Sequence, residues 1–374
     1  MRIRPKEAFL YLLTKAVKAF DWRTTDITAL KPGAVKNILV VSSTAIGDTL
    51  MSTPAIRAVR KAYRGARILA LFNAANAELF ENNPGIDGVI PYRSGFLNFF
   101  PTVKELRKYR FDLAVIFHGN EPETTPLCYL SGTPFILKLP NRSPFRFLLS
   151  NKDPVLGWED LGHGIWTRIK TAEAARCESD GVRMDLFIES TDWAETEMFL
   201  RREGIDEDSV LIGFQPGAST VSRQWFPDRF IELGKLLLMD DPSYRIILTG
   251  SPQEKALCED IAKGIGERTI VSAGRLPLRQ TPPLIKRLKV LVTGDTGPMH
   301  IAYTLGTPVV ALYAVSEPSR TGPLYDAERH RIIKKEKTCD PCLSKRCAYQ
   351  KCMEAITVYE VREAIKEILA GVKV

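Results

Sequence analysis

Short runs of consecutive apolar residues alternate with amphipathic stretches along the chain from Lys36 onward. Strands that are apolar at every position are typical of a parallel sheet covered on both faces, and the stretches between them repeat their apolar residues at helical spacing. The pattern therefore predicts a parallel sheet with helices on both sides. The predicted strands span residues 37–41, 67–72, 88–92 and 113–117, and the predicted helices span residues 55–63, 74–81 and 103–109.

The same alternation restarts at Val210 and predicts a second unit of the same kind. A last helix is predicted at 358–369, because Thr357 and Glu360 have the spacing of a capping box. Residues 118–185 carry six prolines and no clear periodicity, so their structure is left unassigned. The predicted strands of the second half span residues 210–214, 245–248, 269–271, 290–293 and 309–313, and its helices lie near residues 229–238, 253–265, 283–288 and 299–305.

Two tandem units of this kind predict an α/β fold with two Rossmann-like, doubly wound domains and a ligand cleft between them, at the carboxyl ends of the strands. The acidic, helix-like stretch 192–203 is the predicted linker. The predicted parts are a basic amphipathic helix and linker at 1–35, a first domain at 36–195, a second domain at 205–352 and a C-terminal helix at 353–374.

Length and composition agree with a two-domain globular protein. The chain has 374 residues, of which 45% are hydrophobic and 26% charged, and this excludes a wholly disordered or coiled-coil chain. No apolar run reaches eighteen residues, the length of a membrane-spanning helix. Seven cysteines, an odd number, and the lack of a signal peptide favour a reducing cytoplasm.

Positive charge is concentrated in the first part of the chain. Residues 1–150 hold 21 Lys and Arg against 11 Asp and Glu, a net charge of +10, whereas the remainder has 31 against 33, a net charge of −2. The basic part indicates an anionic partner, either a membrane or a phosphorylated substrate. A nucleic acid is not expected, because no nucleic-acid-binding motif occurs.

Two apolar segments in the basic part have two interpretations each. The helix predicted in residues 1–22 has one apolar face surrounded by Lys and Arg, which suits the surface of an anionic membrane but equally suits docking on its own domain. The stretch that contains Phe96, Leu97, Phe99 and Phe100 either touches lipid or belongs to the domain core.

The first motif with chemistry is the segment 42–49, SSTAIGDT, directly after the first strand. Ligands of α/β folds bind at this position. Gly47 gives the backbone freedom to turn, and Ser43 and Thr44 are candidate polar contacts beside it. Asp48 either caps the following helix or serves as a general base toward a substrate hydroxyl. Neither GxGxxG nor a P-loop sequence is present.

The second motif is GDTGPMH at 294–300, between a strand and a helix. Pro298 suits the first helical position, with Gly297 as the cap, so that backbone amides near His300 point out of the helix start. Such amides bind phosphate or diphosphate, and the alternative is an ordinary turn.

The third motif, QPGAS followed by RQW at 215–225, also follows a strand. Gly217 and Ser219 offer an amide and a hydroxyl to a phosphate, and Arg223 is either a phosphate clamp or a solvated loop charge. Trp225 is expected to pack in the core.

The fourth motif is a cluster of four cysteines within fourteen positions. A tetrahedral zinc ion or an iron–sulfur cluster is held by four thiols of this kind, although the spacing matches neither common pattern. Free thiols and a labile disulfide remain alternatives. The four residues are Cys339, Cys342, Cys347 and Cys352.

Three segments together resemble glycosyltransferase family 9, the bacterial lipopolysaccharide heptosyltransferases. They are IGDTLMSTPAIRAVRKAY at 46–63, GAS with RQW at 217–225, and TGDTGPMHIAYTLGTPVVALY at 293–313. The cysteine cluster with the Met353 and Ile356 that follow it also looks like many members of the family. The resemblance extends over nearly the whole chain from Lys36.

The resemblance implies the GT-B fold and an inverting transferase that uses a nucleotide-activated sugar, with ADP-heptose the expected donor. Asp48 matches the proposed catalytic base of the family, beside an acceptor-side loop. Arg223 stands where many members carry Lys, and Ala314 stands where a Gly often follows the strand. The donor-binding segment of the family matches Asp295, Thr296, Gly297 and His300.

The implied reaction needs a base on one domain and a diphosphate site on the other. Asp48 would take the proton of the acceptor hydroxyl, and the helix start with Arg223 would stabilise the leaving diphosphate after domain closure. No cofactor is expected for catalysis. The implied acceptor is a lipid-linked saccharide of the lipopolysaccharide core, which places a peripheral protein on the cytoplasmic face of the inner membrane.

Two other functions stay open from the sequence. One is a GT-B-like nucleotide-sugar epimerase, which would form product without an acceptor. The other is a protein that binds sugar nucleotides without catalysis, and consumption of the donor with a lipopolysaccharide acceptor separates it from the enzymes.

Overall fold

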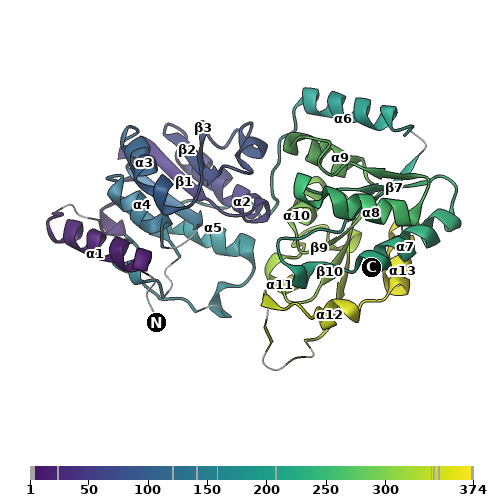
Figure 1. Ribbon diagram of the computed structural model, residues 1–374. Helices are drawn as coiled ribbons and strands as arrows, with labels where there is room; N and C mark the ends of the chain where they lie inside the picture. The colour runs from purple at the N-terminus through teal and green to yellow at the C-terminus, as the bar shows by residue number, and fades with distance from the viewer. Residues whose placement is uncertain are drawn as a thin grey trace. The chain divides into compact units, whose positions relative to one another are not determined.

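The computed structural model shows two compact units, residues 1–187 and 188–374, each built on a parallel sheet (Figure 1). No helix in the part of the chain that the structure describes is long and apolar enough to cross a bilayer. The residues that the structure describes are 5–22, 25–119, 122–139, 142–157, 159–206, 209–337, 339, 342–343 and 346–371.

The sheet of the first unit has five parallel strands in the order β3-β2-β1-β4-β5. β1 lies between β2 and β4, and the register of β1 with β4 shifts between Val41 and Ser42, so that Ser42 pairs with His118. The ends of these two parallel strands therefore lie side by side at the edge where the first motif begins. The strands are β1 (Asn37–Ser42), β2 (Arg67–Asn73), β3 (Gly88–Tyr92), β4 (Leu113–His118) and β5 (Phe135–Lys138).

Helices cover both faces of this sheet (Figure 1). The inner residues Leu39, Val41 and Ile116 share one apolar cluster with α3 and α4, while α2 and α5 pack together on the other face. α1 packs on α4 with Leu10 and Thr14 buried, so it docks on its own unit. The helices are α1 (Pro5–Ala19), α2 (Ile46–Ala62), α3 (Phe96–Arg107), α4 (Thr124–Leu130) and α5 (Gly164–Ala174).

The sheet of the second unit has six parallel strands in the order β11-β10-β9-β6-β7-β8. Every residue of β9 and β10 is buried, as expected for strands covered on both faces. The strands are β6 (Val210–Gln215), β7 (Tyr244–Leu248), β8 (Thr269–Val271), β9 (Val290–Gly294), β10 (Val309–Tyr313) and β11 (Arg331–Lys334).

α7, α8 and α13 share the main apolar core of the second unit with its sheet, and α9 and α10 pack together. α6 belongs to this unit and contacts α9. The helices are α6 (Ser190–Arg202), α7 (Pro227–Asp240), α8 (Lys255–Ile265), α9 (Thr281–Arg287), α10 (Gly297–Leu305), α11 (Pro318–Thr321), α12 (Lys351–Glu354) and α13 (Val358–Leu369).

All nine strands predicted from the sequence occur, whereas the short edge strands β5 and β11 were not predicted. The helix predicted at 74–81 is wrong, since only a 3₁₀ turn forms at Ala77–Phe80. The Asn73 side chain accepts a hydrogen bond from the Ala75 amide, a local turn that competes with helix formation. The capping box of Thr357 and Glu360 is confirmed. The segment predicted as a linker is α6.

Candidate functional site

Asp48 lies in the first turn of α2, at the carboxyl end of the central strand β1. The N-cap of this helix is Ala45, so the interpretation of Asp48 as the helix cap is wrong. A negative charge in the first turn still favours the helix through its dipole. The side chain of Asp48 is 24% exposed and is held by residues from other elements.

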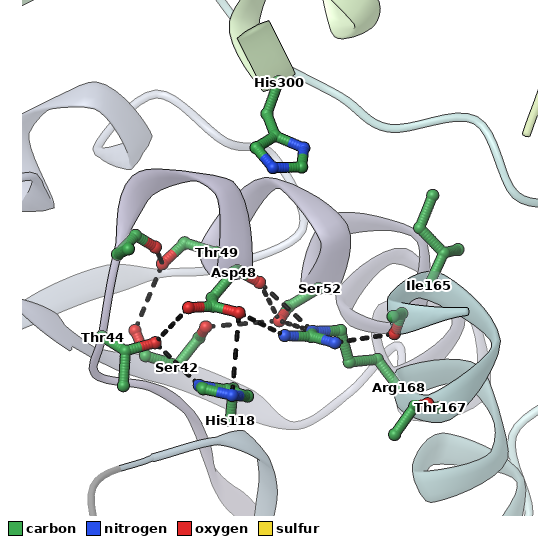
Figure 2. Close-up of polar contacts among 12 residues, drawn as sticks. Ser42, Thr44, Asp48, Thr49, Ser52, His118, Ile165, Thr167, Arg168 and His300 are labelled. Carbon is green, nitrogen blue, oxygen red and sulfur yellow. Dashed lines mark hydrogen bonds and ion pairs between the residues drawn. The ribbon is translucent and has the colours of Figure 1, made fainter. Parts of the chain in front are cut away.

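Thr44, His118 and Arg168 surround the Asp48 carboxylate (Figure 2). The Thr44 hydroxyl donates to Oδ2 at 2.8 Å, and Arg168 Nη2 donates to Oδ1 at 2.8 Å. His118 Nε2 lies 3.7 Å from Oδ1. The carboxylate is therefore fixed in orientation while part of it remains open to solvent.

Arg168 comes from α5, and its side chain is only 4% exposed. Its Nη1 donates to the Gly164 carbonyl at 2.7 Å, and its Nε donates to Ser52 Oγ at 3.2 Å and to the Asp48 carbonyl at 3.3 Å. Burial lowers the pKa of Arg168, an effect that the charge of Asp48 and its hydrogen bond oppose. The guanidinium thus joins α5 to both the side chain and the backbone of Asp48.

His118 ends β4, next to the end of β1, and its side chain is 43% exposed. Its Nδ1 lies 2.7 Å from Thr44 Oγ1. The imidazole, the hydroxyl and the carboxylate consequently form one hydrogen-bonded chain.

The other two residues of the predicted acceptor-side loop are buried. The Ser43 hydroxyl has no hydrogen-bond partner within the described residues, and its amide donates to the His118 carbonyl at 3.1 Å. Gly47 is buried in α2. Of the predicted loop residues, Thr44 is therefore the one whose side chain joins Asp48.

In the second unit the structure brings together Arg223, Asp295 and His300. Arg223 Nη2 lies 3.4 Å from Asp295 Oδ2, and Nη1 donates to the Asp295 carbonyl at 3.3 Å. His300 Nε2 lies 3.8 Å from Asp295 Oδ1. The Asp295 side chain is 5% exposed and that of Arg223 is 19% exposed, so Arg223 is not the solvated loop charge of the alternative interpretation.

The electrostatics of this cluster keep Asp295 ionised. Burial alone raises the pKa of Asp295, but hydrogen bonding and charge from His300, together with Arg223, outweigh burial and lower it to about 2.

The backbone next to Asp295 packs closely on the loop of Arg223. A Cβ at Gly294 would lie 2.4 Å from the Arg223 carbonyl, so only glycine permits this approach. The buried Asp295 carboxylate thus holds the side chains of Arg223 and His300 and is itself almost closed to solvent.

The helix start of the second motif differs by one residue from the prediction. Thr296 is the N-cap of α10 and Gly297 its first residue, so Gly297 is not the cap. The Thr296 hydroxyl lies 2.8 Å from the Thr293 hydroxyl. α10 begins at the carboxyl end of β9, where its first amides are placed to bind an anion.

The third motif follows β6. Gly217 is buried against Glu254, and a Cβ there would lie 1.8 Å from the Glu254 carboxylate. Ser219 is exposed. Trp225 packs in the core as predicted, and its Nε1 donates to the Ile356 carbonyl at 3.1 Å.

The four clustered cysteines line one cavity of about 280 Å³, together with Ser222, Ala314 and Val315. Ser222 precedes Arg223, so this cavity borders the loop that carries Arg223. Among the described residues, no three His, Cys, Asp or Glu side chains lie close enough together to hold a metal ion. The cysteines share a cavity without forming a coordination sphere.

Two residues of the Asp48 site were not predicted. His118 directly follows a predicted strand, and the carboxyl end of a neighbouring parallel strand was a signal that could have found it. Arg168 lies in the stretch left unassigned, and no local pattern marks it.

Comparison with known proteins yields related sequences and folds. A family model of Glycosyltransferase family 9 (heptosyltransferase) matches residues 173–353. The lipopolysaccharide heptosyltransferase 2 of Escherichia coli strain K12 is 27% identical over 317 residues, which cover 79% of this chain and 87% of that protein.

Two solved structures share the fold. The glycosyl transferase family 9 from Veillonella parvula DSM 2008 has a TM-score of 0.75 at 22% identity, covering 90% of this chain and 97% of that chain. The ADP-heptose lps heptosyltransferase II of E. coli has a TM-score of 0.72 at 24% identity, covering 90% and 99%. The predicted GT-B fold of two Rossmann-like α/β units is confirmed.

Proposed function

Since this chain belongs to glycosyltransferase family 9, we propose that it transfers a heptose, with inversion, from ADP-heptose to a saccharide of the lipopolysaccharide core. The names of its relatives support this choice of donor sugar and acceptor. The observation that carries the proposal is the Asp48 carboxylate, oriented by Thr44 and Arg168 at the carboxyl edge of the first sheet.

On the acceptor side, Asp48 acts as the general base. A hydroxyl is a weak nucleophile, and a positioned carboxylate that takes its proton makes attack on the anomeric carbon feasible. Arg168 acts through Asp48, because it holds both oxygen Oδ1 and the backbone of that residue. Arg168 is thus a positioning residue.

On the donor side, negative charge builds on the departing diphosphate as the sugar takes on oxocarbenium character. The Arg223 guanidinium and the first amides of α10 supply positive charge for it. Asp295 holds Arg223 and His300 for this purpose. The proposed mechanism uses protein groups alone and needs no cofactor.

The acceptor is lipid-linked, and we place the enzyme at the cytoplasmic face of the inner membrane through a surface of α1 and α3. Phe9 lies 5.6 Å from Phe96 and 6.5 Å from Phe100, ring centre to ring centre. Leu12 and Leu97 are exposed, as are Phe9 and Phe100. We call Phe9, Leu12, Leu97 and Phe100 the apolar patch.

The two helices that carry the apolar patch also carry exposed lysines, whose charge complements an anionic bilayer. Lys6 and Lys15 on α1 and Lys104 on α3 are exposed. Apolar side chains that enter the interface and cations that meet anionic headgroups bind a membrane together. Within the aromatic stretch, Phe99 is buried in the domain core, whereas Leu97 and Phe100 are exposed. The core interpretation therefore applies to Phe99, and we propose lipid contact for the two exposed residues.

The test of the proposed reaction is Asp48→Asn. The amide keeps the size of the side chain but cannot take a proton, so transfer is expected to fall by about a hundredfold to ten-thousandfold. Binding of ADP, measured by calorimetry, is expected to be unchanged. Asp180→Asn is the matched control, because Asp180 pairs with Arg57 on the same unit.

Normal transfer by Asp48→Asn would refute the assignment of the base. Consumption of ADP-heptose by the wild-type protein without any acceptor would refute the transferase and favour an epimerase. An absence of turnover with binding intact would favour a sugar-nucleotide-binding protein.

A further inference from the structure

The hydrogen-bonded chain at Asp48 fixes where its protons are. An ionised carboxylate only accepts, so the 2.8 Å contact requires the Thr44 hydroxyl to donate its single proton to Asp48. The 2.7 Å contact between Thr44 Oγ1 and His118 Nδ1 then requires the imidazole to donate at Nδ1. Protonation of His118 therefore changes at Nε2, the nitrogen nearer to the carboxylate.

We propose that His118 is the second proton acceptor of the transfer reaction, and that Nε2 takes the proton that Asp48 removes from the acceptor. This inference rests on the proposed function. His118 Nε2 faces Asp48 Oδ1 at 3.7 Å, a distance that a small rotation of the imidazole closes to a hydrogen bond. The half-exposed ring can afterwards release the proton to water.

The surroundings of Asp48 explain why a second acceptor is needed. The ion pair with Arg168 and the hydrogen bond from Thr44 both favour the charged carboxylate over its protonated form. Asp48 is consequently well oriented, and a proton on its carboxylate would compete with these two contacts. An imidazole next to it provides a site that binds a proton near neutral pH.

The step balances in atoms and charge. The acceptor oxygen forms its bond to the anomeric carbon, and the bond from that carbon to the diphosphate oxygen breaks with its electron pair on the phosphate. The acceptor proton passes to Asp48 and then to His118 Nε2. The product state is an imidazolium beside a restored carboxylate, an ion pair that stabilises the transferred proton.

Two variants separate proton transfer from positioning. His118→Ala removes the imidazole, while His118→Asn keeps an amide that donates to Thr44 but accepts no proton at neutral pH. We expect kcat to fall by about a hundredfold in both variants, with the KM values of both substrates unchanged. Imidazole added to His118→Ala is expected to restore part of the lost rate.

The pH profile provides a readout that a structural role does not move. Charged groups near His118 in the described part of the chain include the Asp48 carboxylate of α2 and, beyond it, the Arg168 guanidinium of α5. The wild-type kcat is expected to fall toward acid pH, where an imidazole is protonated in advance. This acid limb is expected to move to lower pH in His118→Ala.

Four outcomes would overturn the inference. They are wild-type kcat and pH profile in His118→Ala, a rise in acceptor KM alone, recovery of activity in His118→Asn, and no rescue by imidazole. Asp48→Asn distinguishes a failure of the role of His118 from a failure of the proposed function. If it is inactive while His118→Ala is normal, the proposed function stands and the role of His118 is wrong; if it is active, the proposed base itself is wrong.

Discussion

At the scale of single residues, the two candidate sites use an arginine–aspartate pair in opposite ways. In the first unit Arg168 is the buried partner and Asp48 the exposed one, at 4% and 24%. In the second unit Asp295 is buried and Arg223 is the more exposed, at 5% and 19%. In each pair the buried residue orients the more exposed one, so that the first unit presents a carboxylate and the second unit presents a guanidinium.

Arg168→Lys tests the positioning of the base. Lysine keeps the positive charge but cannot donate at once to Asp48, Ser52 and the Gly164 carbonyl. We expect kcat to fall at least about tenfold, because small displacements of a catalytic group are costly, while the affinity for ADP stays unchanged. Steady-state kinetics and calorimetry measure both quantities.

Arg57→Lys is the control for this experiment, because Arg57 also ties α2 to other segments, through Asp180 and Asp185, without contacting Asp48. Equal losses of kcat in the two lysine variants would show that the rate depends on the anchoring of α2 in general.

Asp295→Asn tests the anchoring of the donor site. Loss of the buried negative charge removes the partner of Arg223 and His300, and a hydrogen bond to a charged group contributes about 1.5–3 kcal/mol. We expect ADP to bind about tenfold to a hundredfold more weakly by calorimetry. The exposed Asp228→Asn on α7 is the control, and unchanged affinity in Asp295→Asn would remove this residue from the donor site.

At the scale of elements, the central strands were predictable because burial on both faces leaves continuous apolar runs. The edge strands β5 and β11 were missed for different reasons: β5 lies in the proline-rich stretch left unassigned, and β11 has only two apolar residues between Arg331 and Lys334. Asp48 was a candidate because it follows a strand at the edge where ligands bind. Arg168 was not predicted as a site residue, because its partner Asp48 lies 120 positions earlier in the chain. Only the packing of α5 on α2 brings the two side chains together.

The apolar patch of α1 and α3 predicts binding to anionic vesicles. Leu12→Asp with Leu97→Asp places two negative charges among exposed apolar side chains without altering the core. We expect the double variant to lose most of its co-sedimentation with phosphatidylglycerol vesicles, and the wild-type protein to be released by high salt. Met239→Asp, an exposed position of α7, is the control. Undiminished binding of the double variant would exclude the patch.

The cysteine segment is a candidate metal site with free thiols and a labile disulfide as alternatives, and the described residues gather no three ligands. We expect mass spectrometry of the purified protein to find about one zinc or an iron–sulfur cluster per chain, lost in Cys342→Ser and Cys347→Ser. The cavity borders Ser222 and Ala314, so metal removal by a chelator is expected to weaken ADP binding as well. Cys177→Ala, a buried thiol of the first unit, is the control. If the purified protein contains no metal and binds ADP with full affinity, the metal interpretation is wrong and the four cysteines only pack against their neighbours.

At the scale of the whole molecule, charge and function divide in the same way along the chain. The net charge of +10 falls within residues 1–150, which include Asp48, α1 and α3, whereas Arg223 and Asp295 lie in the part of net charge −2. A basic surface attracts an anionic lipid-linked acceptor from a distance, while the donor diphosphate needs only a few fixed cations and amides. For the proposed function, this distribution predicts that electrostatics of different range act on the two substrates.

The stability of the molecule is expected to fall in mild acid because of His330 in the second unit. This ring is buried 4.7 Å from the Tyr303 ring, centre to centre, and burial lowers its pKa from 6.5 to about 4. Between pH 4 and pH 6.5 the unfolded chain binds a proton at this residue that the folded chain does not. The free energy of unfolding therefore rises with pH across this interval and decreases as the pH falls.

From pH 7 to pH 5, this linkage removes about 2 kcal/mol from the free energy of unfolding. His330→Phe keeps a ring against Tyr303 but cannot be protonated. Between pH 7 and pH 5 the variant is therefore expected to lose about 2 kcal/mol less free energy of unfolding than the wild-type protein. Denaturant unfolding of both proteins at the two pH values measures the difference, and the comparison cancels the carboxylates that they share. Parallel pH dependence in the two proteins would mean that water or a rearrangement accommodates the charged ring inside the folded unit.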